Sequence, residues 1–452
     1  MVQAQADLRT PVRSGASRFS TLAEWLSWQH TLSPSEIDLG LERVQTVAQR
    51  MGLDRPPFKI LTVGGTNGKG SAITYLDHIL RAANWRTGVY TSPHLLRYNE
   101  RIRIAGEMVD DQDLCAAFAI VDEARGDIPL TFFEFGTLAA LTVFRSHAVA
   151  VALLEVGLGG RLDAVNAFPS EGALVTSIGI DHTEWLGTER EQIGWEKAGI
   201  YRSGKPAVCA DRAPPERLIQ QAEAIGARLI LAQRDYHYTR HTHPPGHWDW
   251  HDDAHTLTAL PLPALAGDYQ IDNAAGVLAL LSALGQDFTI SVTAIQTGLS
   301  SAHLSGRMDR RWLNGVEVIL DVAHNLQAAE ALTQALLQDS SKGQTQVVLG
   351  MLAGKDSQGV ARALAPLADV WHLVGLEQES TRGSSAQDLW KALQAAGIVD
   401  MIHLHSDVAT ACAVALNASQ PGDRLIICGS FFTVAAAMRC EHLEEIYRGS
   451  SA

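Results

Sequence analysis

The apolar residues of this chain fall into two patterns that alternate along most of its length. Short runs such as 60–63 and 149–156 are apolar at almost every position, which is typical of parallel strands covered on both faces. Between such runs, apolar residues recur three and four positions apart, as in Ile73, Leu76 and Leu80, which indicates helices. Strands that alternate with helices predict an α/β fold with mostly parallel sheets.

The length of the chain and a change of pattern predict two domains. At 452 residues the chain exceeds what one hydrophobic core usually supports. We predict a disordered extension over 1–18, a central domain over 19–305 and a smaller, doubly wound, Rossmann-like domain over 306–452, with the boundary near Gly306. The expected strands of the second domain are 316–320, 347–349, 370–374, 401–404 and 424–428.

The stretch 59–71, KILTVGGTNGKGS, reads as a strand, a glycine-rich turn and the start of a helix. Glycines allow the backbone to approach a phosphate, the first N–H groups of the helix point at it, and Lys69 adds a positive charge. The spacing departs from the usual nucleotide loop, since position 63 is Val and Gly70 separates Lys69 from Ser71. The stretch therefore predicts a P-loop-like phosphate site with an unusual spacing.

Three further polar residues stand at the ends of predicted strands. These are Ser92, Glu155 and His182. In open α/β sheets this edge binds ligands, so we expect all three beside the glycine loop. A carboxylate that ends an apolar strand is costly unless it is paired or coordinated, whereas His182 is equally compatible with a buried histidine bonded to backbone.

Two segments are polar enough to suggest surface positions. Residues 95–105 are rich in Arg and Asn and end in a β-like stretch over 101–104, and we predict a substrate-facing loop there rather than a core element. Residues 236–255 contain six histidines, some of them four positions apart, which allows a metal site. Pro244 and Pro245 would break a helix that used this spacing, so a solvated hairpin or surface excursion is favoured.

Charge and cysteine usage exclude several classes of protein. A formal net charge of −14 argues against a nucleic-acid partner, and no apolar run is long enough to span a membrane. Five widely spaced cysteines without C-x-x-C spacing are typical of a reduced, cytoplasmic protein. An anionic small substrate requires basic residues at one site, which is where the motifs place Lys69, Arg97, Arg101, Arg103, Arg161 and Lys197.

Eight motifs follow one another along the chain. They are Gly65-Thr66-Asn67-Gly68-Lys69-Gly70-Ser71, Thr91-Ser92-Pro93-His94-Leu95, Asn99-Glu100-Arg101-Ile102, Glu155-Val156-Gly157-Leu158-Gly159-Gly160, Asp181-His182, Glu196-Lys197-Ala198-Gly199, Asp321-x-Ala323-His324-Asn325 and Gly350-Met351-Leu352-Ala353. In this order they resemble the folylpolyglutamate synthases of the Mur ligase superfamily, over about residues 20 to 440. The chain is most similar to the bifunctional bacterial form, which is also a dihydrofolate synthase.

The resemblance implies an ATP-dependent amide ligase that needs no protein nucleophile. Such an enzyme joins L-glutamate to dihydropteroate, and further glutamates to reduced folates, through an acyl phosphate. The chemistry requires charge neutralisation and alignment of the components. We expect a monomer that binds ATP between its domains and closes around it.

The resemblance also assigns the nucleotide and metal residues. The nucleotide set comprises Gly65, Thr66, Asn67, Gly68, Lys69, Gly70, Ser71, Asn273, Arg307 and Asp321. Mg²⁺ is expected at two sites, held by Ser92, Glu155, His182 and a carbamate formed on Lys197. The residues alone leave two alternatives open, because Lys197 could pair with a neighbouring acid and Ser71 could simply cap the helix.

Catalytic roles are implied for Lys69, Lys197 and His324. The chain has Val322 and Leu326 where the family has Gly and Pro, and Gly354 where an acid usually precedes Lys355, so an ion pair between the domains stays open there. The expected pterin residues, of which Phe133 could equally pack in the core, are Thr131, Phe132, Phe133, Glu134, Leu162, Asp163 and Ala164.

Two other functions are compatible with parts of these patterns. Another Mur-type ligase, acting on a peptidoglycan precursor, would turn over a nucleotide-sugar substrate instead. A nucleotide-dependent switch would hydrolyse ATP without needing a carboxylate and an amine. The residues at the strand ends together with Lys197 favour the ligase.

Overall fold

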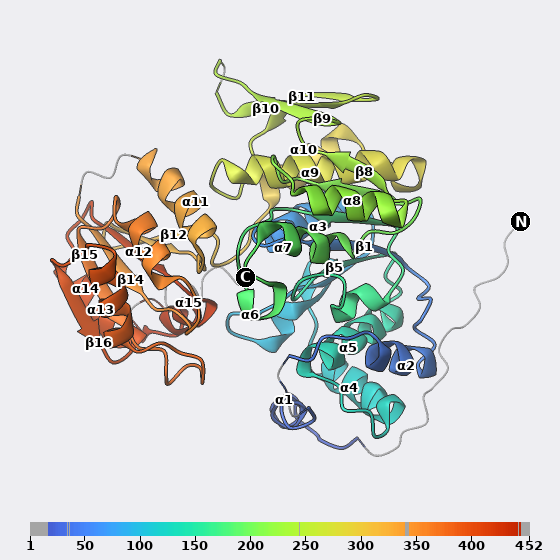
Figure 1. Ribbon diagram of the computed structural model, residues 1–452, viewed down its shortest axis with the longest axis horizontal. Helices are drawn as coiled ribbons and strands as arrows, with labels where there is room; N and C mark the ends of the chain where they lie inside the picture. Colours follow the sequence, from blue (N-terminus) through green and yellow to red (C-terminus); the bar gives the residue numbers. More distant parts are fainter. Residues whose placement is uncertain are drawn as a thin grey trace, which may run out of the picture.

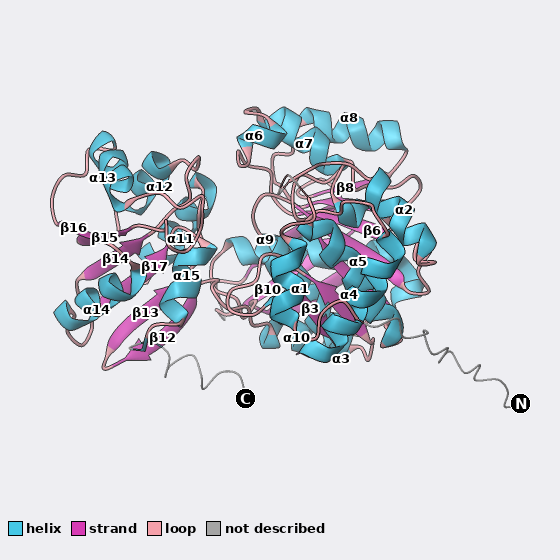
Figure 2. Cartoon of the chain, turned by 90° about the horizontal axis from the view of Figure 1, so that it is seen from below, coloured by secondary structure: helices cyan, strands magenta, loops and turns pink. Residues whose placement is uncertain are grey.

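The computed structural model describes residues 17–33, 35, 37–243, 245–339, 343–441 and 443. Two α/β domains lie side by side, each built on its own sheet (Figure 1). The strands of both sheets lie between helices, as the second view shows (Figure 2). The predicted two-domain fold is therefore confirmed. Most of the predicted extension 1–18 lies outside the described residues, although Arg18 forms an ion pair with Asp122 at 2.8 Å.

The sheet of the central domain has eight strands in the order β4-β3-β2-β5-β1-β6-β7-β8, parallel except at β3 and β4. The strands are β1 (Lys59–Gly64), β2 (Thr87–Tyr90), β3 (Ile102–Ile104), β4 (Glu107–Met108), β5 (Val151–Glu155), β6 (Gly172–Val175), β7 (Pro206–Cys209) and β8 (Arg228–Leu231). The strands β5, β1 and β6 carry the expected ligand edge at the middle of the sheet.

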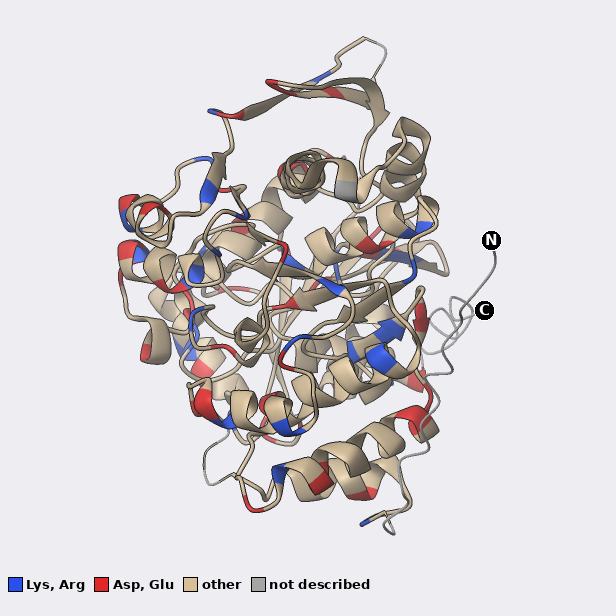
Figure 3. Cartoon of the chain, turned by 90° about the vertical axis from the view of Figure 1, so that its right-hand side faces the viewer, with Lys and Arg blue, Asp and Glu red and all other residues tan. Residues whose placement is uncertain are grey.

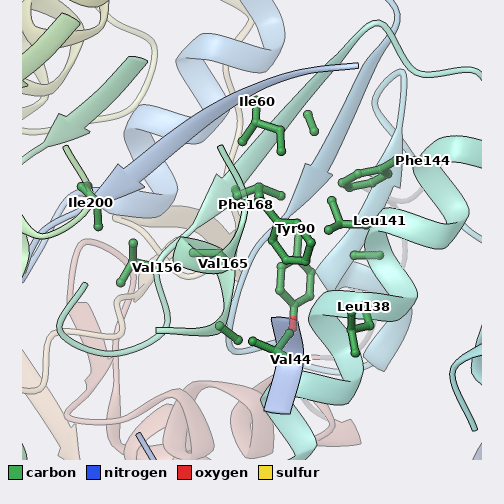
Figure 4. Close-up of a cluster of buried hydrophobic side chains, with 14 of the residues drawn as sticks. Val44, Ile60, Tyr90, Leu138, Leu141, Phe144, Val156, Val165, Phe168 and Ile200 are labelled. Atoms are coloured by element: carbon green, nitrogen blue, oxygen red, sulfur yellow. The ribbon is translucent and has the colours of Figure 1, made fainter. Parts of the chain in front are cut away.

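Helices cover both faces of this sheet. They are α1 (Leu22–Gln29), α2 (Glu42–Arg50), α3 (Lys69–Ala82), η1 (Tyr98–Arg101), α4 (Asp111–Arg125), α5 (Phe132–Ser146), η2 (Ala164–Ala167), α6 (Thr183–Leu186), α7 (Arg190–Ala198), α8 (Glu216–Ile225), α9 (Tyr269–Leu284), η3 (Gly285–Phe288) and α10 (Val292–Ser301). Ile60 and Leu61 follow each other on β1 and enter separate cores, one on each face. Figure 4 shows Ile60 and Tyr90 in one buried cluster with Leu138 and Phe144 of α5.

The β-like stretch at the end of 95–105 is confirmed as a strand, whereas the expectation that this segment is not a core element is wrong there. Residues 102–104 form β3, which pairs antiparallel with β2, and Ile102 and Ile104 are buried in the core. Arg103 occupies the other face of the strand, so the stretch alternates with a period of two.

The histidine-rich excursion 236–255 lies mostly in a three-stranded antiparallel sheet. It is made of β9 (Tyr236–Arg240), β10 (His247–Asp252) and β11 (Thr256–Pro261). The predicted hairpin is confirmed, but its solvation is only partial, because Trp248 and Trp250 are fully buried in the core under α9 and α10. Within the described residues, no group of three or more His, Cys, Asp or Glu is placed to hold a metal ion.

The C-terminal domain has six strands in the order β12-β13-β17-β14-β15-β16. All five predicted strands are present, and the pattern missed β12 because Arg310 and Arg311 interrupt its apolar positions. The elements are β12 (Asp309–Leu313), β13 (Val316–Leu320), α11 (Leu326–Leu337), β14 (Thr345–Leu349), α12 (Ser357–Leu364), β15 (Val370–Val374), α13 (Ala386–Ala395), β16 (Ile402–His405), α14 (Val408–Ala418), β17 (Arg424–Cys428) and α15 (Phe431–Met438).

The two faces of this smaller sheet are covered by different helices, as expected of a doubly wound domain. Leu332, Val360 and Leu389 come from α11, α12 and α13 and enter one core, whereas Val408 and Val434 of α14 and α15 enter the other. On the face of the molecule shown in Figure 3, Lys and Arg segments are interspersed with Asp and Glu segments. None of the described helices is long and apolar enough to cross a bilayer.

Candidate active site

The glycine-rich turn between β1 and α3 is shaped by two glycines with positive φ. Gly65 has φ +145° and Gly68 has φ +87°, and a Cβ atom at either position would collide with Thr176 or Asn273. Lys69 folds back over the turn and donates to the carbonyl oxygens of Gly65 and Thr66 at 3.0 and 3.1 Å. The close packing leaves the first N–H groups of α3 directed at an anion site.

A cavity of about 580 Å³ lies between the two domains, beside this turn. Every residue expected to bind nucleotide or metal lines it, together with the third expected catalytic residue. These are Gly65, Thr66, Asn67, Gly68, Lys69, Gly70, Ser71, Ser92, Glu155, His182, Lys197, Asn273, Arg307, Asp321 and His324. The fold therefore brings the separate motifs to one place.

The expected pterin residues do not line this cavity. Thr131 and Glu134 form the capping box of α5, and Glu134 also pairs with Arg43 at 3.1 Å. Phe133 packs behind the cavity wall against Gly157, where a Cβ atom would lie 2.8 Å from its ring. Asp163 accepts a hydrogen bond from the backbone of Leu158 at 2.8 Å, in the same wall.

The other three expected pterin residues lie on α5, on η2 or in the loop that precedes η2. Phe132 stacks on His30 with ring centroids 4.5 Å apart, Ala164 begins η2, and Leu162 precedes Asp163 in the loop after β5. The structure thus groups these residues around α5 and η2, separate from the cavity. Their role in binding a pterin stays a prediction.

Glu155, the last residue of β5, is 5 % exposed. Within the described residues, the backbone N–H of Ser92 is the only hydrogen-bond donor to its carboxylate, at 3.1 Å. Burial raises the pKa of Glu155, although the charge of Lys69 opposes this. A buried carboxylate with one donor, facing a cavity beside a serine hydroxyl, suits a hard cation such as Mg²⁺.

Lys197 lies on α7 with 3 % of its surface exposed. Burial, and next the charge of Lys69, lower the pKa of its amine to about 7. The adjacent acid Glu196 pairs with Arg161 at 2.9 Å, and Lys197 has no ion pair within the described part of the chain. The alternative of a lysine paired with its neighbour is therefore not realised, and the neutral amine that a carbamate requires is accessible near neutral pH.

Asp181, which follows β6, is the main polar contact between the domains. Its carboxylate forms ion pairs with Lys355 and with Nε2 of His324 at 3.3 Å, and it accepts from the amide of Asn325 at 3.1 Å. Burial alone would raise the pKa of Asp181, but the hydrogen bond and charge of His324, with the charge of Lys355, hold that pKa well below its usual range. The ion pair left open by Gly354 is thus made by Lys355.

His182 stands next to Asp181 in a left-handed conformation with φ +51°. Burial, and next the charge of Lys355, lower the pKa of its imidazole to about 4. The ring is therefore neutral near pH 7, as a metal ligand must be. His324, in contrast, has acceptors at both ring nitrogens, because Nδ1 faces the carbonyl of Val322 at 2.8 Å.

The two domains also meet at the glycine turn itself. The side-chain amides of Asn67 and Asn325 bond each other reciprocally, at 3.1 Å in both directions. Asn325 also caps α11, since its oxygen accepts from the N–H of Ala328. The patterns placed Asn67 with the nucleotide but gave no sign of this pair, because its partner lies more than 250 positions away.

In the part of the cavity that contains Asp321 and Arg307, both expected to bind the nucleotide, the side chains make several contacts with the protein. Asp321 accepts from the N–H groups of Met308 and Ala323, both at 2.8 Å, and burial raises its pKa. Arg307 lies over the ring of Phe431, with 5.1 Å to its centroid.

On the opposite side of this part of the cavity, the buried Gln270 joins two of the expected nucleotide residues. It accepts from the amide of Asn273 at 3.1 Å and donates to the hydroxyl of Ser71 at 3.2 Å. The patterns gave no sign of Gln270, since an amide inside an apolar helix carries no motif.

Comparison with known proteins adds the family. The model of the Mur ligase, glutamate ligase domain, matches residues 306–431. The dihydrofolate synthase/folylpolyglutamate synthase of Escherichia coli is 43% identical over 421 residues, which cover 93% of this chain and 95% of that protein. The chain belongs to this family. The Haemophilus influenzae relative of the same name is 39% identical, over 92% and 96% of the two chains.

Solved structures agree with this membership over the full fold. E. coli FolC in complex with DHPP and ADP superposes with a TM-score of 0.87 and 41% identity, over 97% of this chain and all of the other. A bifunctional enzyme of the family with Mn, AMPPNP and L-glutamate bound gives a TM-score of 0.85 and 42% identity, over 93% and 97%. The family expected from the ordered motifs is confirmed.

Proposed function

We propose that this chain is an ATP-dependent carboxylate–amine ligase of folate biosynthesis. It joins L-glutamate to dihydropteroate, giving dihydrofolate, and adds further glutamates to reduced folates. The observation that carries the proposal is the cavity between the domains, where the glycine turn, Glu155, Lys197 and Asp181 meet. Relatives named for both activities, and structures solved with ADP, AMPPNP, DHPP and L-glutamate, support it.

The reaction has two bond exchanges, and both need charge neutralisation. The γ-phosphoryl group of ATP passes to a substrate carboxylate, and ADP leaves. The glutamate amine then attacks the acyl carbon, the bond to phosphate breaks, and the amine releases a proton as phosphate departs. Lys69 and the N–H groups of α3 hold the phosphates, while Arg307 adds positive charge from the C-terminal domain.

The donor set at the strand ends fits the divalent metal that this chemistry uses. Ser92, Glu155 and His182 would hold one Mg²⁺, and Lys197, carbamylated, would contribute to a second site. A bound ion neutralises the charge that develops on the transferred phosphoryl group. His324 lines the same cavity with its Nε2 3.3 Å from Asp181, and we assign it to the phosphates or the incoming amino acid.

The pterin is assigned to the residues grouped around α5 and η2, which are Thr131, Phe132, Phe133, Glu134, Leu162, Asp163 and Ala164. Phe133 and Asp163 support this because they adjoin Gly157 and Leu158 in the cavity wall. A cytoplasmic location belongs to the same proposal, since ATP, reduced folates and free thiols share that compartment. The division into 1–18, 19–305 and 306–452 also stays a proposal.

Turnover with separate acceptors tests the function directly. Purified protein receives ATP, Mg²⁺ and L-glutamate, with dihydropteroate in one reaction and tetrahydrofolate in another. We expect ADP, phosphate and a product longer by one glutamyl residue in each, measured by coupled assay and mass spectrometry. ADP that forms equally without either acceptor would overturn the proposal and favour a nucleotide-dependent switch.

A further inference from the structure

The segment 376–384, which follows β15, is a closed loop held against the C-terminal domain. The N–H of Leu376 donates to the carbonyl of Ser384 at 3.0 Å, and Ser384 in turn donates to Met351 at 3.0 Å. A Cβ atom at Gly383 would collide with the backbone of Leu376, so only glycine permits this close approach. The loop is therefore set by backbone contacts.

This loop presents Arg382 to the cavity between the domains. The carbonyl of Arg382 accepts from the N–H of Ala353 at 2.8 Å, which attaches the residue to the Gly350–Ala353 motif. Its side chain is exposed and lines the cavity. Two positions beyond Ala353, Lys355 crosses to Asp181 beside His182. Arg382 thus belongs to the part of the cavity wall that the C-terminal domain provides.

Arg382 has no carboxylate partner within the described residues, whereas Lys355 and Arg439 of the same domain do. Lys355 pairs with Asp181, and Glu379, in the same loop, pairs with Arg439 at 2.6 Å. The chain carries 50 Asp and Glu against 36 Lys and Arg, so acids are abundant. An arginine that such a chain leaves unpaired, on a rigid loop at a cavity, is placed for an anion from outside.

Two anionic groups must reach this cavity, and Arg382 suits one of them better. The ATP phosphates belong to the glycine turn, where Lys69 and the N–H groups of α3 converge. The incoming amino acid carries two carboxylates besides the amine that reacts. A guanidinium group binds a carboxylate through two parallel hydrogen bonds, which fixes both position and orientation.

The position of Arg382 also distinguishes between the two carboxylates. The α-carboxylate is attached to the carbon that bears the reacting amine, so it must lie close to the phosphates. The side-chain carboxylate extends away from the reaction and suits an exposed residue at the rim. We propose that Arg382 binds the side-chain carboxylate of the incoming glutamate and selects a dicarboxylic amino acid. This inference rests on the proposed ligase function.

The test compares Arg382→Gln and Arg382→Lys with the original enzyme. Initial rates are measured against L-glutamate at saturating ATP and tetrahydrofolate, and against ATP at saturating glutamate. We expect KM for glutamate to rise about 10- to 100-fold in Arg382→Gln and less in Arg382→Lys, which keeps the charge but loses the paired hydrogen bonds. KM for ATP should stay within about twofold, since the phosphates are held elsewhere.

Substrate analogues separate the two carboxylates. Glutamine lacks the side-chain charge, and isoglutamine lacks the α-carboxylate charge. Arg382→Gln should lose most of the preference for glutamate over glutamine and keep its preference over isoglutamine. The matched control is Arg362→Gln, an exposed arginine on α12 outside the cavity, which removes the same charge and should change neither constant.

Each outcome bears on one claim. An unchanged KM for glutamate in Arg382→Gln, or an equal rise for ATP and glutamate, overturns the inference while the ligase function stands. A loss of preference over isoglutamine instead would show that Arg382 binds the α-carboxylate and would also overturn it. If the original enzyme forms no glutamyl product, the proposed function itself fails. Thermal melts check folding, and Arg382→Lys serves if the glutamine variant unfolds.

Discussion

Two buried aspartates on either side of β1 behave in opposite ways. Asp163 lies in the loop after β5 and is 3 % exposed, and Asp181 follows β6 and is 9 % exposed. Burial raises the pKa of Asp163 to about 7, although backbone N–H groups of Leu158 and Val165 oppose the rise. Burial acts on Asp181 too, but His324 and Lys355 from the other domain hold its pKa well below the usual range. For a buried aspartate of this site, charged partners in the other domain therefore decide whether the pKa is raised or lowered.

The same contrast separates two regions of the cavity. On the side of β5, Glu155 and Lys197 are buried without an ion-pair partner within the described residues, and each has a pKa displaced toward neutrality. At the domain contact, Asp181 is saturated by donors. Groups that the protein leaves unpaired are available to ligands, whereas the paired groups link the two domains.

We expect the largest loss of activity when Lys197, one of the groups without an ion-pair partner within the described residues, is removed. Lys197→Ala deletes the expected metal-binding carbamate, so we expect the ligase rate to fall by about 10³-fold or more while the fold is retained. The measurement is turnover as a function of Mg²⁺ concentration, with a thermal melt beside it. Lys205→Ala, which removes a partly exposed lysine paired with Glu171, is the control and should keep activity. Full activity with an unchanged metal dependence would rule out the role of Lys197.

Removing the charge of Asp181 tests the role of the ion pairs between the domains. Asp181→Asn keeps the shape but removes the counter-charge of Lys355 and an acceptor of His324, which is costly for groups that are partly shielded from water. We expect kcat/KM to fall about 10- to 100-fold and the particle to expand in small-angle X-ray scattering, because the domains separate more easily. The control Lys391→Gln breaks an exposed ion pair with Asp388 within the C-terminal domain. It should change neither kcat/KM nor the size of the particle. A compact, fully active Asp181→Asn enzyme would show that the contact does not govern closure.

The smallest effect concerns Asp163 and the pH dependence of stability. Its pKa is about 7 in the folded chain, against 3.8 for an unperturbed aspartate, so between these values the folded state binds more protons. Stability from this group is therefore lost as pH rises from about 4 to about 7. Asp163→Asn removes the dependence, so its melting temperature relative to the original should rise with pH across that window. A constant difference from pH 4 to pH 8 would show that Asp163 does not titrate there.

Much of the site could be predicted because its residues follow strands. Ser92 and Glu155 stand where parallel strands end and His182 lies in the segment after β6, and the carboxyl ends of parallel strands share one edge of the sheet. The errors arose where the local pattern was broken by function or by an edge position. Arginines concealed β12 and the burial of β3, and buried tryptophans anchor a segment whose composition is otherwise that of a surface.

Local patterns and ordered motifs determined the family, the two α/β domains and the residues that meet at the cavity. These features depend on the spacing of residues along the chain, which can be read from the hydrophobic periodicity and from the positions where strands end. The tertiary structure alone decided which groups pair across the domains, that Lys197 is buried without an acid, and that Arg382 reaches the cavity. These depend on burial and on charges hundreds of positions apart, and electrostatic energy follows distance in space rather than in sequence.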